Sequence, residues 1–487
     1  MNQSTERGPV THQLTNFTAT VLTDIVHDDG LETQRQFELE ARIENRPCRF
    51  QVPARQFQSM GWIGDYLGAE AVVYPGRATN DHARTAIQLL SGKIPEKRVY
   101  THTGWRKLGK EWVYLHAGGA IGPNGPVPGI EVQLPAEFTP YTFPTPPENP
   151  ETQFRASLRL WDVGPDRLTI PCFATWVRAV LGFPKYSVHL VGETDKGKTT
   201  LALLTLQHFG SGLDDQHIPA NWSSTENALE ALAFTAKDSL LVIDDFVACG
   251  SQYDSARLHR KADRVFRAQG NSTGRQRLTS DSELKVQKPP RGLILSTGED
   301  IPRGQSLGAR ILVLEVGPND LDWETVTLCQ ADARSGLYAE TAAGFIQYLA
   351  LIQDSLESGQ IRQHLSEEAG ELRQEILKEG MYRRTATLVA DLALGIRYFL
   401  NYGYRFRVIT SEEKKQLWNR AWKALMEATD AQRSHQADSE PIKRYFELLR
   451  AAIATGRANV ATVDGISPVP SGAWGWQHIH GSLRSKG

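Results

Sequence analysis

The feature that most constrains this chain is a glycine-rich turn between an apolar run and a helical pattern. Residues 192–199 read G-E-T-D-K-G-K-T, follow the alternating run 186–191 and precede apolar residues that continue toward Phe209. In a strand, loop and helix context this spacing predicts a phosphate-binding loop, because closely spaced backbone amides and a helix N-terminus offer several donors to phosphate oxygens. The alternative is a glycine-rich turn that binds nothing.

Each residue type in this loop has a chemical reason. Glycines let the backbone approach a phosphate, Lys198 would reach the β and γ phosphates, and the Thr199 hydroxyl would ligate Mg²⁺. Asp195 stands where many such loops have glycine, and aspartate tolerates left-handed backbone angles better than most residues. The predicted cofactors are therefore ATP and Mg²⁺. The predicted nucleotide-binding residues are Gly192, Glu193, Thr194, Asp195, Lys196, Gly197, Lys198, Thr199 and Thr200.

A second motif follows in the run D-S-L-L-V-I-D-D-F. Four apolar residues, 240–243, stand directly before Asp244 and Asp245, as in a buried strand that delivers carboxylates to the carboxyl edge of a parallel sheet. Asp244 would hold the hydrated Mg²⁺, and Asp245 would orient or deprotonate the attacking water. Many ATPases have glutamate at the second position, so the assignment of the base stays open. The alternative is an apolar strand that ends in a solvated pair of aspartates.

Three further positions are catalytic candidates. A third apolar run ends in Ser296 and Thr297, whose hydroxyls could sense the γ-phosphate or the water, although hydroxyls at strand ends are also common for structural reasons. Arg310 precedes another apolar run and suits a finger inserted into a neighbouring subunit's site, a contribution of roughly 10³ to 10⁵ in rate. Arg303 is the second candidate for the finger, and a surface salt bridge is the alternative for both arginines.

The charge of the whole chain, −2 with a pI near 6.7, does not by itself indicate a nucleic-acid partner. Locally, however, residues 257–291 hold ten basic residues against three acidic ones. Gly270 and Gly274 at the centre predict a hairpin-like excursion that could grip a phosphate backbone. The predicted DNA contacts are Arg275, Arg277, Lys285 and Lys288. The alternative is that residues 257–267 form a solvated helix face, with some of these residues contacting the nucleotide of a neighbouring subunit.

The fold class predicted from these patterns is an α/β P-loop NTPase with a parallel sheet covered by helices. The 487 residues are too many for one core. We predict an α+β domain over 1–135 that binds DNA or a partner, a proline-rich linker over 136–153 and the ATPase domain over 154–320. A helical domain over 321–455 and a glycine-rich aromatic tail, or a truncated module, over 456–487 follow.

The helical domain carries two specific signals. Six apolar residues between 388 and 400 fall on one face at helical spacing, and Thr410 with Glu413 forms a capping box. No stretch of the sequence approaches the roughly 18 to 20 continuous apolar residues needed to cross a bilayer. The first residues also lack the pattern of a secretory signal, so we expect a cytoplasmic location and no membrane partner.

The assembled motifs resemble the helicase-like ATPases of phages and integrated mobile elements, in the AAA+ class near superfamily 3, and a related family known as a domain of unknown function. The resemblance rests on GETDKGKTT, on WSSTENALEAL leading into DSLLVIDDF, and on GLILSTGED followed by GARILVLEV. It covers about residues 155–460. Asp195 and the paired aspartates are expected in superfamily 3, whereas its usual sensor is asparagine and not the Ser296 or Thr297 found in this chain.

This resemblance implies a ring-forming replicative DNA helicase or translocase, a hexamer with ATP at its subunit interfaces and Arg310 acting in trans. Its basic hairpins would contact single-stranded or forked DNA. The N-terminal tryptophans Trp62, Trp105 and Trp112 would either stack on bases or belong to a core. Two alternatives remain: a nucleotide-controlled assembly switch or loader without unwinding activity, and a small-molecule kinase, for which no arginine-bearing lid is identified.

Overall fold

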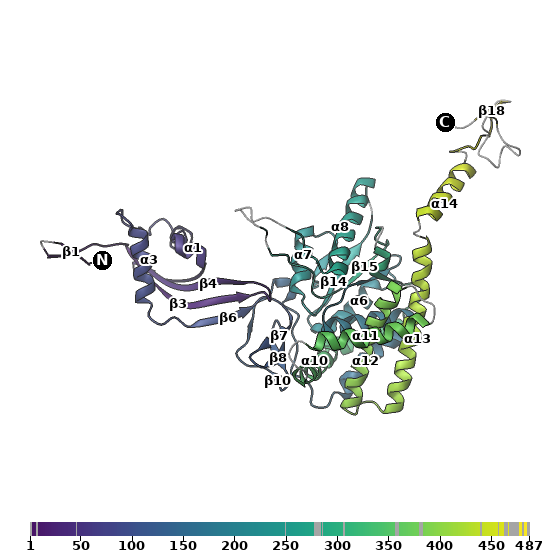
Figure 1. Cartoon of the computed structure of the whole chain (residues 1–487), viewed down its shortest axis with the longest axis horizontal. Coiled ribbons are helices and arrows are strands. Elements are labelled where there is room, and N and C mark those ends of the chain that lie inside the picture. Colours follow the sequence, from purple (N-terminus) through teal and green to yellow (C-terminus); the bar gives the residue numbers. More distant parts are fainter. Residues whose placement is uncertain are drawn as a thin grey trace.

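The structure is elongated, with a central α/β body between an N-terminal group of strands and a projecting C-terminal helix (Figure 1). The computed structural model describes residues 2–5, 8–44, 46–248, 250–276, 284, 286–304, 307–355, 360–378, 383–438, 441–455, 457–461, 466, 477–479 and 482–484. Two of the predicted DNA contacts, Arg277 and Lys285, lie outside these ranges. None of the helices within them is long and apolar enough to cross a bilayer.

The body is built on a five-stranded parallel sheet in the order β13-β14-β15-β12-β16. Apolar runs occupy its strands because both faces are covered by other elements, and this confirms the predicted parallel sheet. All the carboxyl ends therefore meet at one edge. The strands are β12 Ser187–Val191, β13 Ala220–Asn221, β14 Leu240–Phe246, β15 Leu293–Gly298 and β16 Ile311–Glu315.

Helices follow or precede each of these strands. The almost wholly buried helix α5 packs against α6 and against two helices of the C-terminal region. Side-chain oxygens cap two others, since Thr225 accepts from the amide of Ala228 at 3.2 Å and Ser251 from that of Asp254 at 3.2 Å, which satisfies free N–H groups of the first turn. The helices are α5 Asp166–Leu181, α6 Lys198–Leu206, α7 Glu226–Thr235 and α8 Gln252–Asn271.

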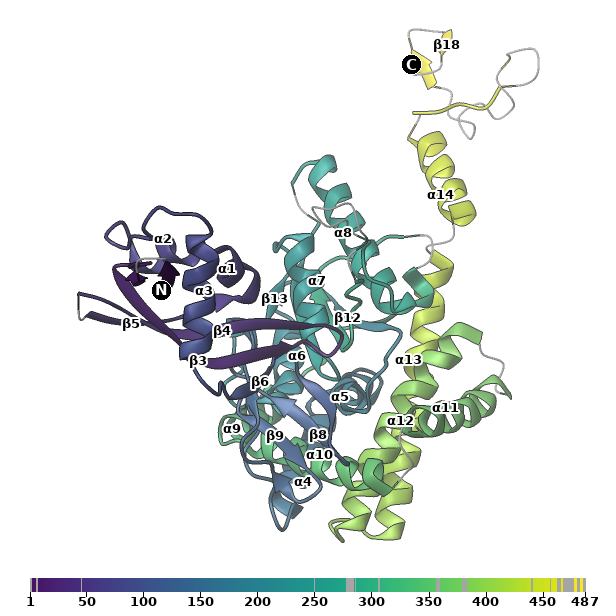
Figure 2. The same cartoon turned by 60° about the vertical axis from the view of Figure 1, so that its left-hand side comes forward.

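The C-terminal region is helical, as predicted, and α11, α12 and α13 lie side by side against the body (Figure 2). The apolar face predicted between 388 and 400 is buried along α12. The capping box is also confirmed, because Thr410 N donates to Glu413 Oε2 at 2.8 Å and Glu413 N donates to Thr410 Oγ1 at 3.2 Å. The helices are α9 Trp323–Arg334, α10 Leu337–Ser355, α11 Gln360–Lys378, α12 Arg383–Arg405, α13 Ser411–Asp438 and α14 Pro441–Ala454.

The first sheet of the N-terminal region, β11-β6-β3-β4-β5, has its own apolar core. Trp62 is fully buried in that core, and helix α3 packs against β3. The elements are β3 Phe17–Asp28, β4 Thr33–Ile43, β5 Arg46–Pro53, α1 Ala54–Ser59, α2 Trp62–Leu67, α3 Thr79–Leu90, β6 Glu96–Tyr100 and β11 Glu131–Val132. Short hairpins near the two ends of the chain pair β1 Asn2–Thr5 with β2 Gly8–Thr11, and β17 Gln477–Ile479 with β18 Ser482–Arg484.

The second sheet, β10-β9-β8-β7, packs on the body instead. Trp105 and Tyr114 in it are buried within the main core, and Trp112 is partly buried against that core. Trp62 and Trp105 are therefore core residues, and Trp112 packs at the edge of the main core. The region predicted as one domain thus consists of two parts with different packing partners. The strands are β7 Gly104–Leu108, β8 Glu111–His116, β9 Gly119–Gly122 and β10 Gly125–Pro126.

The proline-rich segment predicted as a linker is packed against the body. Its aromatic residues Phe138, Tyr141 and Phe143 are buried, and the Tyr141 hydroxyl donates to the carbonyl of Leu240 in β14 at 2.8 Å. Prolines prevent regular structure between η1 Ala136–Phe138 and α4 Glu151–Leu158, while the interleaved aromatic side chains fix the segment to the sheet. The connection between the N-terminal region and the body is therefore a fixed one.

Candidate functional site

The candidate phosphate loop joins the carboxyl end of β12 to the start of α6. A side chain at Gly192 would place its Cβ 2.4 Å from the carbonyl oxygen of Val316, so only glycine fits. Gly197 has a φ of +85° and caps α6. Asp195 has a φ of +60°, which confirms the left-handed conformation expected there. The loop backbone thus has the tight curvature that a phosphate cradle requires.

The first two side chains of α6 turn back toward the loop and the sheet. Lys198 is only 8% exposed, and its Nζ donates to the carbonyl oxygen of Glu193 at 2.5 Å, across the loop. Thr199 Oγ1 donates to Asp244 Oδ1 at 3.0 Å. The loop, the helix start and the carboxylate predicted as a metal ligand therefore belong to one site.

Asp244 is the centre of this site. The hydroxyl of Thr297, at the end of β15, donates a short hydrogen bond to Asp244 Oδ1, the same oxygen that Thr199 contacts. The ladder between β14 and β15 is irregular between Ile243 and Phe246, and Asp245 within this irregularity has a φ of +68° and is exposed. Such bulges re-aim side chains beside active sites. Asp244 therefore contacts Thr199 and Thr297, whereas Asp245 is exposed and available for a different role.

The two hydroxyls at the end of β15 have different environments. Ser296 is buried in the sheet, where it accepts from Trp222 Nε1 at 2.8 Å and lies 3.1 Å from His189 Nδ1. Burial lowers the pKa of His189 to about 4, so this imidazole is neutral near pH 7. Ser296 is therefore a structural residue, whereas Thr297 contacts the carboxylate. Of the two sensor candidates only Thr297 remains.

The donor set around Asp244 suits a hard cation. Mg²⁺ prefers oxygen ligands and is commonly held by one or two carboxylates together with water and phosphate oxygens. One carboxylate and the hydroxyls of Thr199 and Thr297 meet here. Across the described ranges no group of three or more His, Cys, Asp or Glu side chains forms a metal cage.

The two candidate arginine fingers lie apart from this site. The carbonyl of Arg310 accepts from Ser187 N at 2.9 Å, at the amino-terminal end of β12, whereas the loop follows its carboxyl end. A strand of this length, at about 3.3 Å per residue, separates the two edges by about 16 Å. Arg310 therefore cannot serve the loop of its own chain. Arg303 is exposed, and its backbone amide donates to His259 Nδ1 at 3.2 Å.

The basic segment 257–291 divides between helix α8 and the chain that follows it. Residues 257–267 lie on α8, as the alternative assignment to a helix face requires. There Arg264 pairs with Glu226 at 2.7 Å, Arg267 pairs with Asp263 at 2.9 Å, and Lys261 Nζ donates to the carbonyl of Trp222 at 2.8 Å. Arg257, Arg260 and Arg275 are exposed as well.

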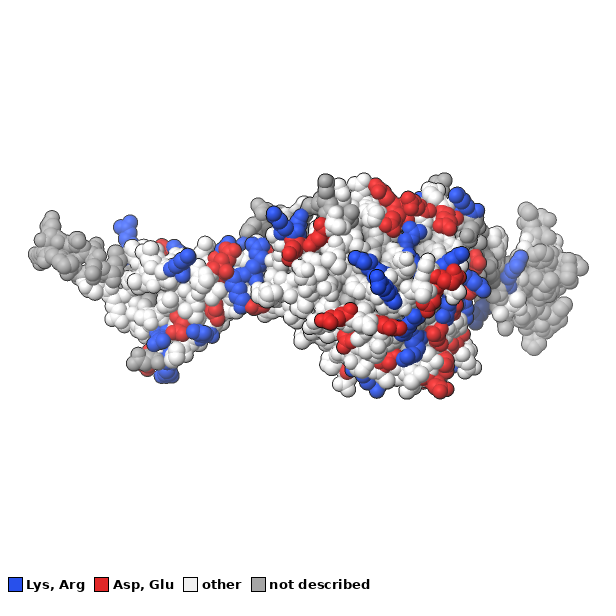
Figure 3. Space-filling model, turned by 90° about the horizontal axis from the view of Figure 1, so that it is seen from below, with Lys and Arg blue, Asp and Glu red and all other residues white. Residues whose placement is uncertain are grey.

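Lys288 is held by the N-terminal region. Its Nζ lies 2.6 Å from Asp29 Oδ2 and 3.7 Å from Glu32 Oε2, both in the turn between β3 and β4. Arg291 NH1 donates to the carbonyl of Asp29 at 2.8 Å, and its guanidinium stacks 3.5 Å from the Phe234 ring centre. Lys288, one of the predicted DNA contacts, therefore forms ion pairs within the chain. On the face in Figure 3, basic and acidic side chains are mixed over the body.

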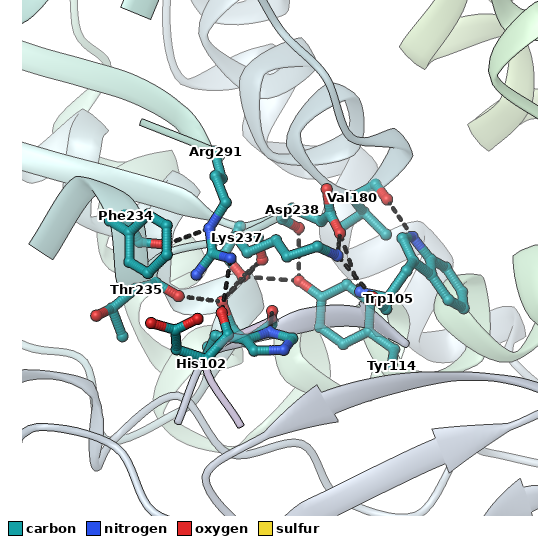
Figure 4. A network of polar contacts seen from close by, with 12 residues as sticks. His102, Trp105, Tyr114, Val180, Phe234, Thr235, Lys237, Asp238 and Arg291 are labelled. Atoms are coloured by element: carbon teal, nitrogen blue, oxygen red, sulfur yellow. Dashed lines mark hydrogen bonds and ion pairs between the residues drawn. The ribbon is translucent and has the colours of Figure 1, made fainter. Parts of the chain in front are cut away.

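A buried polar network fixes β7 to the body beside these residues (Figure 4). The carboxylate of Asp238 accepts from Trp105 N at 3.0 Å and pairs with Lys237, whose Nζ donates to the Trp105 carbonyl at 2.6 Å. Trp105 Nε1 donates to the carbonyl of Val180 at 2.7 Å. Gly104 has a φ of +87°, and a Cβ there would lie 2.3 Å from the Lys237 carbonyl oxygen. The junction is therefore specific in both shape and polarity.

Two residues at the loop were missed by sequence reasoning. The carboxylate of Glu299 accepts a short hydrogen bond from Thr194, so an exposed acid lies against the loop. Trp323, 52% exposed, approaches Gly197, whose Cβ would lie 3.2 Å from Trp323 Cη2. Glu299 could have been proposed from the sequence, because it directly follows the polar strand end in the run S-T-G-E-D. Trp323 could not, because it approaches the loop from the start of α9, far along the chain.

The comparisons agree with this geometry at the level of the fold. A family described as a domain of unknown function (DUF927) matches residues 166–288. A solved structure described as the SCCmec type IV Cch active helicase has a TM-score of 0.54 and 12% identity, over 95% of this chain and 82% of that one. The JCV helicase bound to an organic compound matches with a TM-score of 0.26 and 16% identity over 50% of this chain and 66% of that one, which is too slight to argue from. No curated protein matches.

The structure and this likeness define a helicase-like fold. It has a mixed α/β body typical of nucleotide triphosphatases and a helical C-terminal region. At 12% identity the likeness extends to the fold alone.

Proposed function

We propose that this protein is an ATPase that couples ATP hydrolysis to translocation along DNA or to its unwinding. The observation that carries the proposal is the convergence of the Thr199 and Thr297 hydroxyls on one oxygen of Asp244, beside the loop that holds Lys198. A glycine-rich turn without a ligand would have no need for this arrangement. The helicase-like fold supports the coupling to DNA.

Each residue has a role in this proposal. The loop amides and Lys198 bind the phosphates and stabilise charge that develops on the transferred group. Asp244 and Thr199 would hold Mg²⁺, which would neutralise phosphate charge when bound. Thr297 keeps the Asp244 carboxylate oriented. Asp245, exposed at the irregular end of β14, orients the attacking water or accepts its proton.

DNA stimulation of ATP hydrolysis is the direct test. We expect single-stranded DNA to raise steady-state turnover, and the Arg275→Ala, Arg277→Ala double variant to lose most of this stimulation while its basal rate persists, because these cations would contact phosphates and not ATP. Arg334→Ala is the matched control, since Arg334 is an exposed arginine on α9. The stimulation should also decline as salt is raised.

Absence of DNA stimulation together with absence of forked-duplex unwinding, in a chain that still hydrolyses ATP, would contradict the motor. That outcome would favour the nucleotide-controlled switch or loader.

We also propose that the active form is a ring, a hexamer, in which Arg310 completes the site of the neighbouring chain. Its place at the far edge of the sheet from its own loop supports a role in trans. Arg310→Ala should then reduce ATP turnover by roughly 10³-fold or more while sedimentation velocity shows unchanged assembly. Unchanged turnover in an assembled variant would exclude Arg310 and leave Arg303 as the candidate.

A further inference from the structure

A second recess lies at the amino-terminal edge of the central sheet, on the opposite side from the phosphate loop. It is a cavity of about 690 Å³ between the ends of α5 and α8, the starts of β12 and β16, and helices α11 and α12. Ligand pockets generally span about 300 to 1,000 Å³. The recess is therefore large enough for a small ligand, and Arg310 is the one described lining residue to which the proposed ATP hydrolysis assigns a role.

The charges around this cavity are unbalanced. Among the described residues that line it, Asp391 is the one acid, and it is already paired: Arg178 NH2 donates to Asp391 Oδ1 at 3.0 Å, and Arg178 Nε lies 2.9 Å from Asp391 Oδ2. Three other cations, Lys185, Arg362 and Arg373, then line the cavity with no further carboxylate among the lining residues. Arg310 lines it as well, and its NH2 donates to Asn271 Oδ1 at 3.0 Å.

Cations brought together in a recess repel one another, and low-dielectric walls concentrate their field. Part of the wall is apolar: Leu365 and Leu388 are buried there, and Phe183 is 50% exposed with the Arg362 guanidinium 4.7 Å from its ring centre. Within the described part of the chain, the buried Nε of Arg373 has no hydrogen-bond partner. An anion with several oxygens would relieve the repulsion and supply acceptors.

We propose that this cavity is a second anion site that binds a polyphosphate, inorganic or on a nucleoside. Guanidinium groups match phosphate oxygens with paired hydrogen bonds, and three arginines besides the paired Arg178 converge here with Lys185. An aromatic and aliphatic wall beside the cations accommodates the uncharged part of a nucleotide. A bound anion would add negative charge beside Arg310, which lines the cavity at the amino-terminal edge of the sheet.

Calorimetric titration with inorganic tripolyphosphate tests the site in the full chain. The Lys198→Ala variant removes the cation of the phosphate loop, and we expect it still to bind one equivalent. Adding Lys185→Gln and Arg362→Gln should weaken that binding by about tenfold or more, because each removes a charge-assisted contact. Both side chains are exposed, so the protein should remain folded, and Arg310 is left intact.

Lys110→Gln, in the exposed turn between β7 and β8, is the control and should bind like its parent. Loss of all binding in Lys198→Ala, or equal affinity with and without the two glutamine substitutions, would overturn the proposal. The result does not depend on ATP hydrolysis, since a chain whose loop binds nothing would still bind one equivalent in the unsubstituted form.

Discussion

Replacing Lys198 with alanine is expected to lower ATP turnover by at least about 100-fold, the loss typical when one preorganised donor to a developing charge is removed. Lys198 is 8% exposed and its Nζ already lies across the loop against the Glu193 carbonyl, so its charge is placed where a phosphate would bind. The effect should appear in steady-state phosphate release both with and without DNA, because Lys198 acts on ATP hydrolysis itself and not on its coupling to DNA.

Lys415→Ala on helix α13 is the matched control, since it removes an exposed lysine far from the loop in sequence and should leave turnover unchanged. Both variants should show the thermal unfolding of the parent chain. Full hydrolysis by a folded Lys198→Ala protein would show that the loop is not the catalytic phosphate site, and it would remove the basis of the proposed function.

Much of this site could be predicted from the sequence because its signals are local. Apolar runs that end in polar residues predict parallel strands, and parallel strands bring their carboxyl ends to one edge. The choice between Ser296 and Thr297 could not be made in this way. Successive side chains of a strand point to opposite faces, and only the packed sheet shows that one faces Trp222 and the other Asp244.

The N-terminal region shows where local signals end. Its α+β character is predicted from the sequence, but its division into two parts depends on contacts between segments far apart in sequence. Trp105 Nε1 donates a hydrogen bond to the carbonyl of Val180, and the Tyr114 hydroxyl donates to the carbonyl of Asp238 at 2.6 Å. Prolines similarly predict an irregular segment over 136–153, whereas the burial of its aromatic side chains depends on the sheet beneath them.

The basic segment gives the same lesson for charge. Counting residues finds the excess, but it does not show which cations are available for DNA. Acidic residues far away in the sequence pair with some of these cations: Asp29 pairs with Lys288, and Glu226 pairs with Arg264. Lys288 and Arg291 also contact the β3–β4 turn, which links the residues just before β15 to the N-terminal sheet.

The largest effect on stability is expected from Asp238→Ala. Asp238 is buried and accepts from Trp105 N at 3.0 Å, and its removal leaves that amide without its acceptor and the Lys237 ammonium without its carboxylate partner. Breaking a buried pair from one side costs about 3 to 5 kcal/mol, and the lower end applies because the Lys237 side chain is 21% exposed. The first calorimetric transition should fall by several degrees.

The pH dependence of this loss distinguishes an unpaired charge from a simple cavity. Burial lowers the pKa of Lys237, and Asp238 opposes that shift. Without Asp238 the folded chain would hold the proton less tightly than the unfolded chain, so stability should rise with pH up to the ordinary lysine range near 10. The double variant Lys237→Gln, Asp238→Asn removes both charges and keeps an acceptor that tolerates the φ of +51°. It should recover most of the loss, and equal destabilisation of the single and double variants would mean that shape, not charge pairing, holds the junction.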